Sequence, residues 1–201
     1  MTRLLLIRHG LTDAVGHHLA GIAPGTHLND VGLAQVAVLV ARLHDVPLTA
    51  IVSSPLERTR ETAEPIANDH ALTVEIVPEL IEYDVGAWTD ATFATLQSDA
   101  TWLRFNRLRS LTQPERGESM LDVQHRAVEA LLDLWRRHRN GNVAVVSHGD
   151  VIRAALLYFL GMPIDFYSRL DVLPARISVI ELGDDAPRVL LVNGDGVSGL
   201  L

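Results

Sequence analysis

The sequence predicts an α/β protein, a three-layer α/β/α sandwich around a mostly parallel central sheet. Short apolar runs alternate with longer segments of helical periodicity along the 201 residues, which is the pattern of strands joined by crossover helices. Two of these runs, residues 3–8 and 143–146, are nearly continuous in apolar side chains, as strands buried on both faces are. No repeat, linker or low-complexity tract interrupts the chain, so residues 1–201 are expected to form a single domain.

The first half of the chain predicts two strand-helix units. A strand at 3–8 precedes a loop at 16–25, and Asn29 or Asp30 is expected to cap a helix that runs to about residue 44. A buried strand at 50–52 follows. Pro55 suits the first turn of the next helix, predicted over residues 56–69.

The second half predicts one more unit and a terminal pair of strands. A short strand at 74–77 leads into a less regular stretch at 79–114. A strongly periodic helix at 118–139 then precedes the strand at 143–146 and a helix at 151–160. Two final strands are expected at 177–182 and 189–192, joined by a turn at 183–185.

Composition narrows the classes of function. The chain has no cysteine, which excludes disulfides, thiolate nucleophiles and cysteine-type zinc sites. Its formal charge of −8 argues against a nucleic-acid partner. No apolar run approaches the roughly 18 residues of a membrane span, and no secretion signal is evident, so no membrane partner and a cytoplasmic location are expected.

Histidines end two of the predicted strands. Arg8-His9-Gly10 follows the strand at 3–8, and Ser147-His148-Gly149 follows the strand at 143–146. Ligands of open α/β sheets bind beyond the carboxyl ends of strands, so both imidazoles are expected to face one pocket. The glycines permit tight turns, and the helix that starts after Gly149 offers its positive end to an anion.

An arginine marks the end of a third strand. Arg58 lies in the first turn of the helix after Ser53-Ser54-Pro55, where a cation opposes the helix dipole. A bound phosphate would explain this position, because a guanidinium binds phosphate with two parallel hydrogen bonds. A solvated arginine paired with Glu57 or Glu61 is the alternative.

Together these segments resemble the histidine phosphatase superfamily, which includes phosphoglycerate mutases and small-molecule phosphatases. The resemblance covers residues 3 to about 160 and rests on motifs in the same order, namely Leu6-Ile7-Arg8-His9-Gly10, Ser53-Ser54-Pro55-Leu56-Glu57-Arg58, Leu80-Ile81-Glu82 with Gly86 and Trp88, Gly117-Glu118-Ser119, and Val146-Ser147-His148-Gly149. It implies a phosphoglycerate mutase-like fold.

The resemblance also implies roles for individual residues. His9 would attack phosphorus and become a phosphohistidine, while Arg8, Arg58 and His148 would hold the phosphoryl oxygens. Glu82 would protonate the leaving oxygen and later activate water, with Asp84 as the nearest rival acid. Substrate contacts are expected from Arg8, Thr12, Gly21, Arg58, His148 and Gly149. Neither a metal ion nor another cofactor is required.

Some positions depart from the family pattern. Leu11 and Val15 stand where the family often has Glu and Asn, and Thr89-Asp90 replaces a frequent Glu-Gly. The adjacent His17 and His18 are expected to be surface loop residues rather than metal ligands.

Residues from about 87 to 116, the lid segment, are expected to form a lid over the pocket. One reading is an amphipathic helix with solvated arginines and with Trp102 and Phe105 packed inward. The other reading directs one or two of its arginines into the pocket to bind a second anionic group of the substrate; the candidates are Arg104, Arg107, Arg109 and Arg116.

The expected partner is a small-molecule phosphomonoester, and a homodimer is a candidate assembly that the sequence does not decide. Hydrolysis is favoured over mutase-type transfer, because a mutase must shield its phosphohistidine with a more extensive cover than this lid segment offers. A non-catalytic phosphate-binding or interaction module is the alternative of another class.

Overall fold

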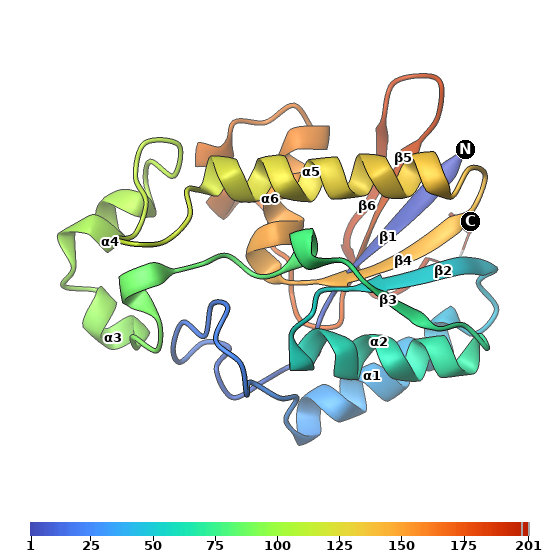
Figure 1. Ribbon diagram of the computed structural model, residues 1–201, viewed down its shortest axis with the longest axis horizontal. Coiled ribbons are helices and arrows are strands. Elements are labelled where there is room, and N and C mark those ends of the chain that lie inside the picture. Colours follow the sequence, from blue (N-terminus) through green and yellow to red (C-terminus); the bar gives the residue numbers. More distant parts are fainter. Residues whose placement is uncertain (198, 201) are drawn as a thin grey trace.

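The computed structural model describes residues 1–197, 199 and 200, and it places six strands in one sheet of order β3-β2-β4-β1-β5-β6 (Figure 1). The strands are β1 (Thr2–Arg8), β2 (Leu48–Ser53), β3 (Val74–Ile76), β4 (Asn142–Ser147), β5 (Ile177–Leu182) and β6 (Arg188–Gly194). Strands β1 to β4 pair in parallel, and β5 runs antiparallel to both β1 and β6. The mostly parallel sheet is confirmed.

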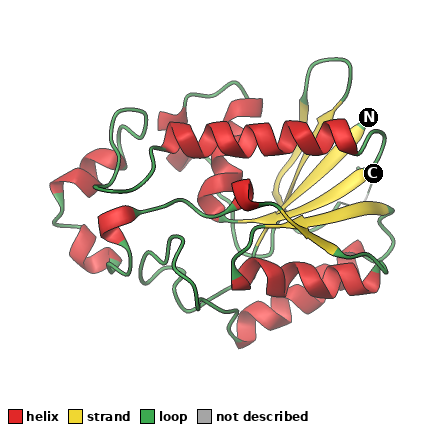
Figure 2. Cartoon of the chain, viewed as in Figure 1, coloured by secondary structure: helices red, strands yellow, loops and turns green. Residues whose placement is uncertain are grey.

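Helices cover both faces of this sheet (Figures 1 and 2). Helices α1 (Asp30–Leu43) and α2 (Glu57–Asp69) lie on one face, and α5 (Met120–Arg137) and α6 (Gly149–Phe159) lie on the other. Because side chains alternate along a strand, Leu5 and Ile7 pack with α1 and α2, whereas Leu4 and Leu6 pack with α5 and α6. These four side chains are at most 2% exposed, and each burial stabilises the fold by about 2 kcal/mol.

Capping side chains decide where the helices begin. Asn29 accepts a hydrogen bond from the Gly32 amide, which settles the start of α1. Ser119 and Asp122 form a capping box, so α5 is shorter than the predicted 118–139. The placement of Pro55 in a first helical turn was wrong: Leu56 is still extended and is the N-cap of α2, so Pro55 precedes the helix.

The lid segment lies beyond the carboxyl ends of the strands (Figure 1). A single amphipathic helix was the wrong expectation, because two short ones form, α3 (Phe93–Leu96) and α4 (Ala100–Phe105). Asp99 starts α4 anew by accepting hydrogen bonds from the amides of Thr101 and Trp102. Phe105 is fully buried and Trp102 packs beside it, so the apolar side of the lid segment does face inward.

The described residues also form three 3-10 helices, η1 (Pro78–Leu80), η2 (Gly86–Trp88) and η3 (Ile164–Arg169). Within the described part of the chain, none of the helices has the length and apolarity that crossing a bilayer requires.

Candidate active site

A pocket of about 310 Å³ opens at the carboxyl ends of the strands, between the sheet and the lid segment. Its polar lining comes from separate parts of the chain: Arg8 ends β1 and His9 follows it, Arg58 belongs to α2, and Glu82 follows η1. The backbone at Gly21 and Gly149 also reaches the pocket. The topology therefore brings these predicted residues together, as the convergence of strand ends requires. His148, which was also predicted to face the pocket, is fully buried and is not part of its lining.

His9 is held in one protonation form by its neighbour. Its Nδ1 lies 2.7 Å from the Gly10 carbonyl oxygen, and because a carbonyl can only accept, Nδ1 must carry the ring proton. Burial, with the positive charges of Arg8 and Arg58, keeps the pKa of His9 well below its ordinary value. The ring is therefore neutral, and its Nε2 retains a lone pair that can attack an electrophile.

Two arginines keep unpaired donors at the pocket. Arg8 Nη1 donates to the Val172 carbonyl at 2.7 Å, and Arg58 Nη2 donates to the Gly21 carbonyl at 2.9 Å. These bonds fix both guanidinium groups, yet Arg8 Nε and Arg58 Nη1 are buried without an acceptor. Buried N–H groups left in this way are suited to the oxygens of a bound anion.

Thr12, Gly21 and Gly149 line the pocket as predicted. The Thr12 hydroxyl is buried and has no partner. Gly21 has φ of +51°, and a Cβ there would lie 2.7 Å from a methyl of Val85. A Cβ on Gly149 would lie 3.2 Å from the Arg8 guanidinium, so glycine lets that group rest on the start of α6.

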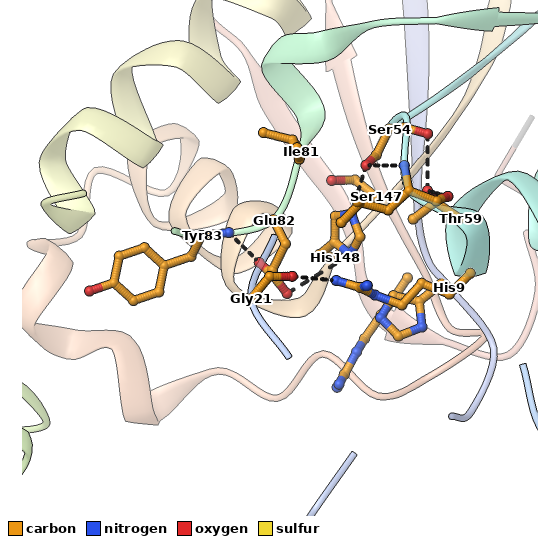
Figure 3. A network of polar contacts seen from close by, with 12 residues as sticks. His9, Gly21, Ser54, Thr59, Ile81, Glu82, Tyr83, Ser147 and His148 are labelled. Atoms are coloured by element: carbon orange, nitrogen blue, oxygen red, sulfur yellow. Dashed lines mark hydrogen bonds and ion pairs between the residues drawn. The ribbon is translucent and has the colours of Figure 1, made fainter. Parts of the chain in front are cut away.

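His148 lies beside His9 at the end of β4, with the two ring centroids 5.3 Å apart (Figure 3). Its Nε2 is 2.7 Å from the Ser54 hydroxyl, and its Nδ1 has no hydrogen-bond partner. The nearest carboxylate oxygen, Glu82 Oε2, is 3.9 Å from Nδ1. Burial and the charge of Arg58 lower the pKa of His148 well below its ordinary value, so this ring is also neutral.

The Glu82 carboxyl exchanges its proton near neutral pH. Burial raises its pKa to about 7, and the negative charge of Asp150 acts in the same direction while Arg58 opposes it. Its Oε1 accepts a hydrogen bond from the Tyr83 amide at 2.9 Å, which fixes the carboxyl group (Figure 3). A carboxyl with this pKa can donate a proton in one step and accept one in the next.

Hydrogen bonds from neighbouring elements hold these groups in place. Thr62 accepts from the Gly10 amide and donates to the Arg58 carbonyl, which ties the turn after β1 to α2. Ser147 donates to the Leu80 carbonyl, and Arg126 of α5 donates to the carbonyl of Glu82. Sequence reasoning missed Arg126, because only tertiary structure shows which face of α5 meets this loop.

Three other pocket residues were missed or left undecided. Asp150 and Arg153 of α6 both line the pocket, and Arg109 is the lid arginine that reaches it; Arg104 and Arg107 are exposed, and so is Arg116. The spacing of Arg153, four residues after Gly149, was the available signal, since it places both residues on one helix face.

Two nearby residues need comment. His18 is a partly exposed loop residue, as expected, and it also lines the pocket, where its loop pairs with Thr92 of the lid segment. Asp84 is not in the pocket lining; its carboxylate accepts from the Gly86 amide, and the second pocket carboxylate is Asp150. In the described part of the chain, no three His, Asp or Glu side chains gather as metal ligands would.

Comparison with known proteins shows the family. The model of the histidine phosphatase superfamily, branch 1, matches residues 4–195. A metal-independent phosphoserine phosphatase of Arabidopsis thaliana is 32% identical, over 92% of this chain and 78% of its own length. The bifunctional protein Rv2228c of Mycobacterium tuberculosis is 35% identical over 97% of this chain, which spans only 54% of that relative.

A solved structure agrees with the sequence relatives. The alpha-ribazole phosphatase of Shigella flexneri superposes with a TM-score of 0.84 at 29% identity, over 96% of this chain and 97% of that one. The chain therefore belongs to branch 1 of the histidine phosphatase superfamily and has its phosphoglycerate mutase-like fold.

Proposed function

We propose that the chain hydrolyses a small-molecule phosphomonoester in two displacements, through a phosphohistidine on His9 and without a metal ion. The observation that carries this proposal is the hydrogen bond from His9 Nδ1 to the Gly10 carbonyl, which leaves a neutral, nucleophilic Nε2 in a pocket of unpaired arginine donors. The names of the relatives, which include phosphoserine and alpha-ribazole phosphatases, support the reaction class.

In the first displacement, His9 Nε2 forms a bond to phosphorus as the bond from phosphorus to the ester oxygen breaks. Glu82 gives its proton to that departing oxygen, so the product leaves as an alcohol. Arg8, Arg58 and His148 donate hydrogen bonds to the phosphoryl oxygens, whose negative charge shifts during transfer.

In the second displacement, water attacks the phosphohistidine. Glu82, now a carboxylate, takes a proton from the water as the new oxygen–phosphorus bond forms and the nitrogen–phosphorus bond breaks. Inorganic phosphate leaves, and His9 and Glu82 return to their starting protonation states. Splitting the reaction in this way replaces one difficult step with two easier ones.

Rapid quench of the purified chain with ³²P-labelled phosphomonoesters and a chelator tests the proposal. Acid-labile, base-stable label on the wild type, followed by free phosphate, is the expected result, and His9→Ala should form no label. Label that passes to an acceptor sugar acid would identify a mutase. Turnover that survives in His9→Ala would overturn the mechanism, and phosphate binding without turnover would identify a non-catalytic module.

A further inference from the structure

Two arginines on the lid side of the pocket, Arg109 and Arg153, stack on the ring of Tyr167. The Arg109 guanidinium carbon lies 3.5 Å from the ring centroid of Tyr167, and that of Arg153 lies 4.1 Å from the same centroid. Arg109 also stacks on Phe105 at 4.3 Å, and its Nη2 donates to the Asn106 side chain. These contacts fix the two cations in position.

Neither cation has an ion-pair partner in the described part of the chain, and the negative charge of Asp150 acts on both only from a greater distance. Among the residues that the structure describes, no carboxylate oxygen lies within 4.0 Å of either guanidinium, and the Nε of each is buried without an acceptor. Arg109 is only 7% exposed. Stacking satisfies the faces of the guanidinium groups but not their N–H edges, and a desolvated cation without a partner is costly. An anionic ligand would supply an acceptor for these N–H edges.

The charge of the whole pocket points to the same conclusion. Its charged lining consists of Arg8, Arg58, Arg109 and Arg153 against Asp150 and Glu82. When Glu82 carries the proton that it donates, four positive charges face one negative charge. A phosphomonoester dianion neutralises two of the remaining three, so the pocket still has room for one more negative charge.

We infer that Arg109 and Arg153, braced by Tyr167, form a second anion site for a carboxylate on the same substrate molecule. The substrate class is therefore a phosphorylated carboxylic acid, with its phosphate at His9 and its carboxylate at the Arg109–Arg153 pair. This inference rests on the proposed function, because it assigns the remainder of the substrate in the same pocket. The names of the relatives do not decide it, since an alpha-ribazole phosphatase stands among them beside a phosphoserine phosphatase.

Matched substrates test the inference. 3-Phosphoglycerate has a carboxylate where glycerol 3-phosphate has a hydroxymethyl group, and the two compounds are otherwise identical. Hydrolysis of p-nitrophenyl phosphate measures the phosphoryl-transfer groups alone. The wild type should favour 3-phosphoglycerate by about thirtyfold in kcat/KM, as one charge-assisted pair of hydrogen bonds supports. Arg109→Gln and Arg153→Gln should each lower this preference by about tenfold and change p-nitrophenyl phosphate hydrolysis by less than about threefold. Arg107→Gln, on the exposed side of the same segment, is the matched control.

Three results would overturn the inference. The first is equal kcat/KM for the two substrates, and the second is an equal loss on all substrates in both variants, which would make the arginines purely structural. The third is a preference for propane-1,3-diol bisphosphate over its monophosphate without any preference for the carboxylate, which would assign the site to a second phosphate.

Failure of the proposed function is separable from these results. If the chain hydrolyses none of the substrates, titration calorimetry of 3-phosphoglycerate and glycerol 3-phosphate still measures the second site. Tighter binding of 3-phosphoglycerate than of glycerol 3-phosphate, with the difference lost in both variants, supports the inference. Equal binding of the two compounds by the wild type overturns it.

Discussion

Arg126 and Glu118 form a two-pronged ion pair, with Nε 2.8 Å from Oε1 and Nη2 2.9 Å from Oε2. The same guanidinium donates to the carbonyl oxygens of Glu79, Ile81 and Glu82, and Glu118 accepts from the Asp84 amide. The pair thus anchors both sides of the loop at 79–84, which carries the proposed acid Glu82. Neither Arg126 nor Glu118 lines the pocket itself.

Loss of the Arg126–Glu118 ion pair should lower both the stability of the chain and its kcat. Arg126→Ala leaves Glu118 half-buried and unpaired, so we expect a loss of about 2 kcal/mol in the free energy of unfolding. A misplaced Glu82 should also lower kcat for alkyl phosphates by about tenfold. Arg137→Ala, on the same helix and in an exposed ion pair, is the control and should cost less than about 1 kcal/mol. Equal losses in the two variants would contradict the anchoring role.

The leaving group should report the role of Glu82. Glu82→Gln cannot donate a proton, so kcat for an alkyl phosphate should fall by about 100-fold or more. An aryl phosphate with a good leaving group should lose far less, and steady-state rates on both compounds measure the difference. The exposed neighbour variant Glu79→Gln should match the wild type on both. Equal slowing of both substrates by Glu82→Gln would transfer the role to Asp150, the other carboxylate of the pocket.

Asp150 should set the alkaline limb of the pH profile. Its negative charge adds to burial in raising the pKa of Glu82, so Asp150→Asn should lower that pKa. Glu82 then loses its proton at lower pH, and the alkaline fall of kcat should move down by about 0.5 to 1 pH unit. Profiles of kcat between pH 5 and 9 measure this shift. The exposed variant Asp171→Asn should leave the limb in place, and an unmoved limb in Asp150→Asn would contradict the prediction.

Glu82 should also make stability depend on pH. Its pKa is about 7 in the folded chain and close to its ordinary 4.5 after unfolding, so the folded state binds more protons in between. The wild type should therefore lose about 2 to 3 kcal/mol of unfolding free energy as pH rises from 4.5 to 8, relative to Glu82→Gln. Urea unfolding of both proteins at the two pH values measures this difference. Equal losses of unfolding free energy in the two proteins would mean that folding does not raise the pKa of the Glu82 carboxyl.

Ser54 should orient the ring of His148. The Leu56 amide approaches the Ser54 hydroxyl oxygen at 3.5 Å, and we expect the hydroxyl proton to point to His148 Nε2, which leaves the ring proton on Nδ1. Ser54→Ala should weaken binding of inorganic phosphate about tenfold and change the ¹⁵N shifts of the ring. Ser53→Ala, whose hydroxyl bonds only the adjacent carbonyl, is the control. An unchanged ring spectrum in Ser54→Ala would refute the orientation.

The sequence was most informative where chemistry follows local rules. His9 and His148 could be predicted because each ends an apolar strand and precedes a glycine, and parallel strand ends converge. Arg58 followed from its unfavourable place in a first helical turn. These features are readable within a few residues.

The remaining site residues depend on contacts between distant segments. Nothing near Arg109 distinguishes it from the exposed Arg107, because the distinction is the position of Tyr167, far along the chain. Asp150 and Arg126 likewise gain their roles only when α6 and α5 settle on the sheet. The homodimer stays a prediction; α1 does expose Val31, Leu33 and Val38.

The central place of β1 has a consequence for how the chain is made. Leu4 pairs on one side with Val143 and on the other with Ile180, so β1 waits for two strands that are synthesised well after it. Such long-range pairing makes folding slow, and the exposed Leu4-Leu5-Leu6-Ile7 run is prone to aggregate until its partners arrive. A ribosome-bound fragment that stops before β5 should therefore be unable to turn over substrate and should need a chaperone.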